Sequence, residues 1–137
     1  MSADESLSQF ISERRNFEVK YTPEGAPVIT EYRPPSRASM PKEIRKLVRR
    51  RTRRRIPRSV LLTLEEACKL LINKRTSFRV IFGANDVIIY LDLDHFIHIY
   101  PNKISIAGYN SLKEEPLASL RQVLEKHAPV KLLKPVR

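Results

Sequence analysis

Hydrophobic positions in the second half of the chain recur at the spacings of helices and strands. Residues 63–66, TLEE, have the form of a capping box, in which the threonine hydroxyl accepts a hydrogen bond from the amide three residues on. Apolar residues follow at helical spacing, so the pattern predicts a helix over residues 63–73. A second capping box at residues 111–114, SLKE, begins another apolar stripe and predicts a helix over residues 112–128.

Between these helices lie apolar runs that are typical of strands. The runs span residues 77–82, 87–93, 95–100 and 103–107. A single long strand over residues 87–100, bent at its aspartates, is the alternative reading of the two middle runs. Together these elements predict a compact α+β domain over residues 59–129, with a small antiparallel sheet of three or four strands flanked by the two helices. The tail, residues 130–137, is apolar and basic, and we expect it on the surface or on a partner.

The first forty residues carry weaker patterns. Residues 4–15 have an apolar side at helical spacing, and residues 16–21 and 28–33 alternate as strands do on either side of a turn. A hairpin is one reading. The other is an extended arm, because four prolines punctuate the stretch. We favour an N-terminal arm over residues 1–40 that has local structure and docks on something else, with a linker at 34–40.

Charge changes this picture at one place. The chain has a formal net charge of +11, and residues 41–58 hold ten Lys or Arg against one acid, Glu43, which accounts for nine of those charges. Eight of the ten are Arg, whose planar guanidinium pairs with a phosphate through two hydrogen bonds. We call residues 41–58 the arginine-rich segment. Its candidate nucleic-acid-binding residues are Arg45, Lys46, Arg49, Arg50, Arg51, Arg53, Arg54, Arg55 and Arg58.

The segment also has a predicted shape. Ser39 is a suitable N-cap, and Ile44, Leu47 and Val48 form an apolar stripe along two turns. The stripe then stops, so a helix continuing to Arg55 is basic all round and has no core of its own to bury. The pattern predicts an arginine-rich helix that ends by residues 56–57, Ile-Pro. Helices of this kind commonly become ordered on RNA.

A solvated helix face usually mixes acids with bases, but no acid follows Glu43 until Glu65. We therefore expect a non-enzymatic nucleic-acid-binding protein with RNA favoured over DNA, in a ribonucleoprotein assembly of ribosome-like style that includes other proteins. The alternatives are a DNA-binding regulator or packaging protein of a virus or mobile element, a protein that docks on and blocks a nucleic-acid enzyme, or a targeting signal alone.

One group of residues deserves a test for chemistry. Asp92 and Asp94 lie on one face of an extended chain and could bind Mg²⁺, with His95 and His98 nearby. The alternative is a pair of acids at a strand end, which we favour, so we expect no catalytic residue, metal or cofactor. The single cysteine, Cys68, lies on an apolar helix face and is expected to be a buried structural thiol.

The sequence also bears on location. No apolar run reaches the length of a membrane span, and the first residues, MSADES, include acids and no apolar stretch. We expect an intracellular protein without a membrane partner, cytoplasmic, or nuclear if the source is eukaryotic.

Overall fold

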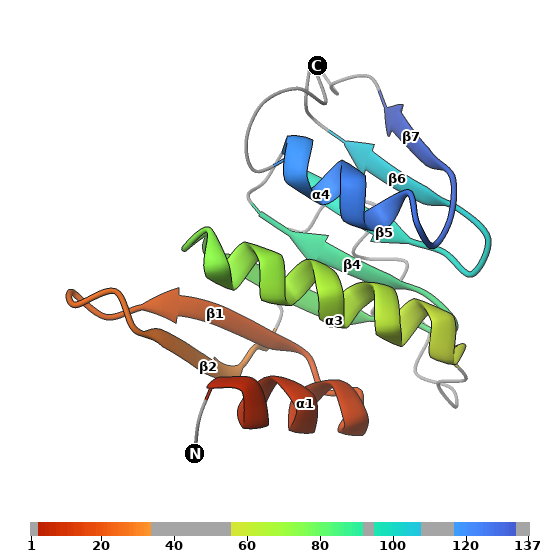
Figure 1. The fold of residues 1–137 in the computed structure, drawn as a ribbon. Coiled ribbons are helices and arrows are strands. Elements are labelled where there is room, and N and C mark those ends of the chain that lie inside the picture. The colour runs from red at the N-terminus through yellow and green to blue at the C-terminus, as the bar shows by residue number, and fades with distance from the viewer. Residues whose placement is uncertain (1–2, 34–55, 92–94, 108–116, 134–137) are drawn as a thin grey trace.

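The computed structural model of the protein describes residues 3–33, 56–91, 95–107 and 117–133. Within these ranges, seven strands form one sheet with the order β2-β1-β3-β4-β5-β6-β7 (Figure 1). The strands are β1 (Phe17–Tyr21), β2 (Pro27–Glu31), β3 (Phe78–Phe82), β4 (Val87–Tyr90), β5 (Phe96–Ile99), β6 (Ile104–Ala107) and β7 (Val130–Leu133). The helices are α1 (Ala3–Glu13), α3 (Arg58–Asn73) and α4 (Leu117–Leu124).

The α+β class is confirmed, whereas the expected sheet of three or four strands is too small. The N-terminal residues do not form an extended arm, because β1 and β2 make a hairpin and β1 pairs antiparallel with β3. The expected C-terminal tail supplies β7, which pairs parallel with β6. The sheet is therefore mixed. The first addition buries apolar side chains that a free arm would leave in water, since Phe17 and Val19 of β1 are fully buried. Val130 of β7 is partly buried against the main core.

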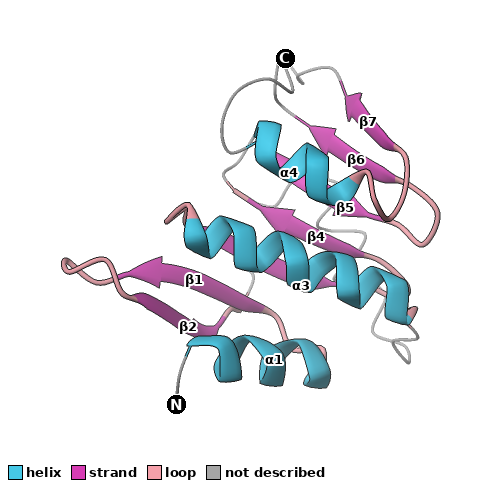
Figure 2. Cartoon of the chain, viewed as in Figure 1, coloured by secondary structure: helices cyan, strands magenta, loops and turns pink. Residues whose placement is uncertain are grey.

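The three helices lie on one face of the sheet (Figures 1 and 2). The main core lies between these helices and the strands, and α3 packs against both α1 and α4. Phe17 of β1 lies at the aromatic centre of this core. Its ring centroid is 5.6 Å from that of Phe10, 6.4 Å from that of Phe78 and 6.4 Å from that of Phe82. The N-terminal hairpin thus shares one core with the rest of the protein.

Helix α3 begins five residues before the predicted start, at Arg58. Pro57 is its N-cap residue, with φ −59° and ψ 147°, and the preceding Ile56 is 5% exposed in the core. The predicted capping box at residues 63–66 is wrong because Thr63 is buried in the middle of the helix, where its hydroxyl donates to the carbonyl of Ser59 at 2.7 Å. The predicted end at residue 73 is confirmed.

Helix α4 is shorter at its C-terminal end than the predicted helix over residues 112–128. It ends at Leu124, and the amides of His127 and Ala128 donate to the Leu124 carbonyl in a closing turn. Pro129 disfavours helical backbone in the residue before it, and its own carbonyl accepts from the Ile104 amide at 2.8 Å. The chain therefore leaves the helix in time to pair with β6. Residues 112–116 lie outside the described ranges.

The other face of the sheet, which we call the second face, carries a smaller apolar cluster. Every residue of β4, β5 and β6 is buried, so these strands contribute side chains to both faces. Tyr32 packs against the second cluster. The buried members of that cluster are Ile81, Ile88, Tyr90, Phe96 and Ala107. The strand aromatics Phe78, Tyr90 and Phe96 are therefore core residues and form no exposed surface for stacking.

Replacing Phe17 tests whether the N-terminal hairpin belongs to the folding unit. We expect Phe17→Ala to lower the free energy of unfolding by about 3–5 kcal/mol, because it removes a fully buried ring and leaves a cavity. Urea denaturation followed by circular dichroism measures this change. The control is Val28→Ala in the same hairpin, which is 43% exposed and should cost less than about 1 kcal/mol. If Phe17→Ala destabilised the protein as little as Val28→Ala does, the N-terminal hairpin would not belong to the same folding unit.

Candidate nucleic-acid interface

The arginine-rich segment connects two anchored points of the fold. Before it, the Tyr32 amide donates to the Asn16 carbonyl at 3.0 Å, and near its C-terminal end Ile56 is buried in the core. Arg58 is exposed at the first residue of α3, so it belongs to that helix. The remaining candidate residues lie outside the described ranges: Arg45, Lys46, Arg49, Arg50, Arg51, Arg53, Arg54 and Arg55.

The described part of the chain has nearly balanced charge. It holds thirteen Lys or Arg and ten Asp or Glu, and several of them form surface ion pairs. These pairs include Arg15 with Glu31 at 3.0 Å, Lys69 with Glu65 at 3.2 Å and Arg121 with Glu125 at 2.7 Å. Acids and bases are interleaved here as on an ordinary solvated surface. The excess of positive charge is therefore a property of the arginine-rich segment.

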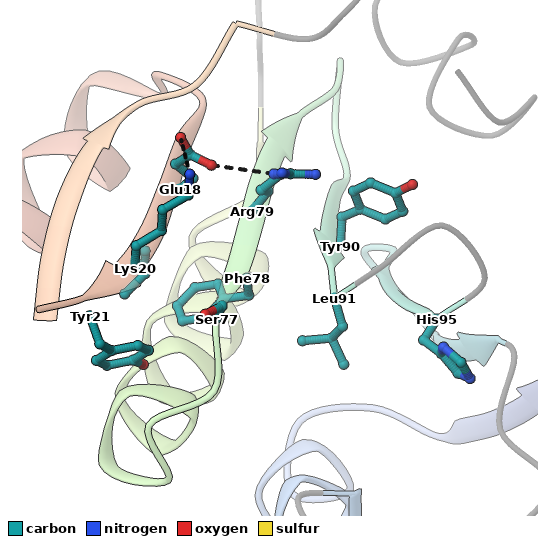
Figure 3. Close-up of a pocket in the computed structure, with 10 residues that line it drawn as sticks. Glu18, Lys20, Tyr21, Ser77, Phe78, Arg79, Tyr90, Leu91 and His95 are labelled. Carbon is teal, nitrogen blue, oxygen red and sulfur yellow. Dashed lines mark hydrogen bonds and ion pairs between the residues drawn. The ribbon is translucent and has the colours of Figure 1, made fainter. Parts of the chain in front are cut away.

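A cavity of about 820 Å³ lies at the end of the sheet where β1 and β3 separate. β1 pairs with β3 from Phe17 to Val19 only, and its last two residues pair with β2 alone. The separation leaves a hollow between the end of β1, the start of β3 and the end of β4. In Figure 3, Lys20 and Tyr21 lie on one side of this hollow, and Leu91 and His95 lie on the other.

Arg79 lines this cavity, and two contacts hold its guanidinium. Its Nε lies 3.3 Å from Oε2 of Glu18, the residue opposite it on β1, and its Cζ lies 5.2 Å from the centre of the Tyr32 ring. Lys20 lies 4.0 Å from the other carboxylate oxygen of Glu18 (Figure 3). Two cations thus share one carboxylate, which leaves a local excess of one positive charge at the rim. Long side chains held by such contacts lose less freedom when a ligand binds.

Tyr21 lines the cavity, and Tyr32 lies beside Arg79 at its rim. The Tyr21 hydroxyl donates to the carbonyl of Thr76 at 2.9 Å and fixes the loop before β3 against the end of β1. Burial raises the pKa of the Tyr21 phenol, and burial also raises the pKa of the Tyr32 phenol. Both phenols therefore stay neutral at physiological pH and add no phenolate charge that would repel an anion.

The residues considered for metal binding do not form one group in the described chain. Asp92 and Asp94 lie outside the described ranges. His95 lines the cavity, whereas His98 is 4% exposed within the second face. The two histidines are three residues apart, so the alternation of a strand directs them to opposite faces. Among the residues that the structure describes, no three His, Cys, Asp or Glu side chains lie close enough to hold a metal ion.

His98 instead forms a buried pair that the sequence pattern does not reveal. Its Nε2 lies 2.7 Å from Oδ2 of Asp86, and both side chains are 5% exposed. Its ring stacks on Tyr100 at a centroid distance of 3.8 Å, and Ser105 lies opposite it on β6. Asp86 looks like one more polar turn residue in the sequence. Only the strand register brings it diagonally next to His98.

The Asp86–His98 pair should contribute measurably to stability. We expect Asp86→Ala to lower the free energy of unfolding by about 1–3 kcal/mol, because it leaves a buried imidazole nitrogen without its acceptor. Asp86→Asn keeps an acceptor oxygen and should lose less. The matched control is Asn85→Ala, an exposed position in the same turn, which should change stability by less than about 0.5 kcal/mol. Thermal and urea unfolding measure all three, and equal effects at 85 and 86 would contradict a structural role.

Cys68 should be inert in the native protein. Burial, with a smaller contribution from Glu65, raises the pKa of its thiol well above the ordinary value, so the reactive thiolate is absent near neutral pH. We expect no reaction with dithionitrobenzoate at pH 8 in the native state and one equivalent of reaction in denaturant. The chain contains a single cysteine, so the signal has one source. Rapid reaction without denaturant would contradict the burial of α3.

Comparison with other proteins adds no family to these observations. No family model matches the chain, and no curated protein and no solved structure is significantly similar to it. Within the described ranges, no helix has both the length and the apolar character needed to cross a membrane. The function is therefore inferred from the residues and the geometry of this chain.

Proposed function

We propose that this protein is a non-enzymatic, RNA-binding component of a ribonucleoprotein assembly, and that its arginine-rich segment contacts the phosphate backbone. The separation of charge along the chain carries this proposal. Residues 41–58 hold ten Lys or Arg against Glu43, whereas the described residues, Arg58 included, hold thirteen against ten acids. Like charges at this density repel one another, and a polyanion relieves the repulsion.

The identity of the cations favours phosphate as the charge that they meet. Eight of the ten are Arg, which forms paired hydrogen bonds with phosphate oxygens and also stacks on bases. A sequence that is basic on every side suits folded RNA, because phosphates surround a segment that enters it. Each contact releases a bound counterion, so affinity should fall steeply as salt rises.

The folded part of the chain supports this role by holding both ends of the segment. Tyr32 is hydrogen-bonded to the turn before β1, and Ile56 is buried in the core. A segment whose two ends are fixed has fewer conformations to lose when it becomes ordered on a partner. Other proteins of the assembly are expected neighbours of the surface that the RNA leaves free.

Reversing charges within the segment tests the proposal. We expect Arg50, Arg53 and Arg54 replaced together by Glu to weaken binding of a structured RNA hairpin by at least about 100-fold. The magnitude of the negative slope of log affinity against log salt should decrease by about one for each lost phosphate contact. Fluorescence anisotropy between about 50 and 200 mM salt measures both quantities, and circular dichroism should report an unchanged fold.

The control makes the same change in net charge elsewhere. Lys74, Lys126 and Lys131 are exposed on the folded part, and their joint replacement by Glu should leave most of the affinity intact. Equal losses in the two triple variants would contradict a special role for the segment, as would retained binding in the first. Tighter binding of duplex DNA than of RNA would favour a DNA-binding regulator. A protein complex that survives nuclease treatment would favour a blocker of a nucleic-acid enzyme.

A further inference from the structure

We infer that the cavity between β1, β3 and β4 is a binding site for one unpaired nucleotide of the RNA, with the base inside and its phosphodiester at Arg79 and Lys20. This inference rests on the proposed function, since the arginine-rich segment is what holds the RNA nearby. Such a site adds a contact that depends on the structure of the RNA, whereas the arginine-rich segment by itself responds to charge alone.

The inner surface of the cavity suits a flat, partly apolar ligand. The half-buried side chains of Tyr21 and Leu91 supply accessible apolar lining, and the core residues Val19, Phe78 and Tyr90 lie behind it (Figure 3). Sites for small molecules typically have volumes of about 300–1,000 Å³ and combine apolar walls with a few polar groups at fixed places. A nucleobase matches such walls with its π-faces, whatever its sequence.

The charges at the rim suit a phosphodiester better than a dianion. Among the described lining residues, Arg79 and Lys20 carry two positive charges, and Glu18, within 4.0 Å of both, carries one negative charge. The excess of one positive charge complements the single charge of a phosphodiester. A dianion such as free phosphate carries one charge more than this excess and would meet the Glu18 carboxylate at the same rim. The same carboxylate can accept a hydrogen bond from the N3–H of uracil or from the exocyclic amine of another base.

Arg79 is also oriented before any ligand arrives. The Glu18 carboxylate and the Tyr32 ring hold its guanidinium from two sides, while its side chain is still 43% exposed. Arginine offers five N–H donors in a fixed fork, so these contacts leave further donors for a phosphate oxygen. A cation ordered in this way binds with a smaller loss of side-chain entropy than a free one.

One contact joins the cavity rim to the last described residues before the arginine-rich segment. Tyr32 contacts Arg79, and Arg33 is the last described residue before the segment. On the far side, the half-buried side chain of His95 lines the cavity.

The test compares two RNAs that differ by one nucleotide. One is a fully paired hairpin, and the other is the same hairpin with a single bulged uridine, each titrated into the full chain at fixed salt. Stacking one base on protein changes affinity by roughly tenfold, so we expect the bulged RNA to bind about tenfold more tightly. With 4-thiouridine at the bulge, ultraviolet light should cross-link it to a peptide that contains Arg79, Tyr90 or His95.

Two variants locate the effect. Arg79→Gln should lower the ratio of affinities for the bulged and the paired hairpin by at least about fivefold. It should change the affinity for the paired hairpin itself little. Ser77→Trp, at an exposed position on the cavity wall, should fill the cavity and do the same. The matched control is Arg121→Gln, which also takes one cation from an ion pair with a glutamate and should leave the preference unchanged.

Each outcome has a defined meaning. No preference for the bulge, a cross-link only outside the cavity, or equal effects of Arg79→Gln and Arg121→Gln would each overturn this inference. If the paired hairpin still binds with a steep salt dependence in those cases, the proposed function stands without the nucleotide site. If neither RNA binds, the proposed function fails first. Binding of uridine monophosphate alone, in a protein that binds neither hairpin, would identify a small-molecule site and overturn the inference.

Discussion

The pairing of β1 with β3 is the interaction on which the rest of this structure depends. Phe17 and Val19 lie opposite Val80 and Phe78, residues about sixty positions later in the chain. This pairing adds the N-terminal hairpin to the sheet and inserts the Phe17 ring among three other aromatic rings of the core. Burial of such a ring contributes several kcal/mol, which offsets the entropy lost when two distant segments are brought together.

The same pairing also shapes a cavity at one end of the sheet. It is short, so β1 and β3 separate at one end of the sheet and leave a cavity between them. On the second face, it sets Glu18 opposite Arg79, and the hairpin brings the Tyr32 ring to the same guanidinium. A packing interaction on one side of the sheet thus arranges charged groups on the other. Alternation of side chains along a strand is the reason that both follow from one register.

The charge of the protein is organised in the opposite way, by sequence and not by folding. The described residues distribute acids and bases evenly, and no folded surface collects the excess. The arginine-rich segment carries it within eighteen consecutive residues. Its attachment at Tyr32 and Ile56 ties a strongly cationic stretch to a stable, nearly neutral body.

The sequence by itself determined the local elements and the location of the charge. Strands β3 to β6 and the end of α3 follow from apolar alternation and helical spacing, which act within a few residues. The nine candidate cations also follow from composition alone, although only Arg58 falls within the described chain. The start of α3 was misplaced because TLEE imitates a capping box in the middle of a helix. Pro57 was a signal for the true start.

Only the tertiary structure decided which elements share the sheet and which side chains meet. Nothing in the pattern of residues 17–21 distinguishes an exposed hairpin from one paired with β3, because pairing depends on a partner far along the chain. The Asp86–His98 pair and the Glu18–Arg79 rim likewise join residues 12 and 61 positions apart. Periodicity reports which face a residue occupies, whereas register decides its neighbours across the sheet, and register is fixed only when the whole core is packed.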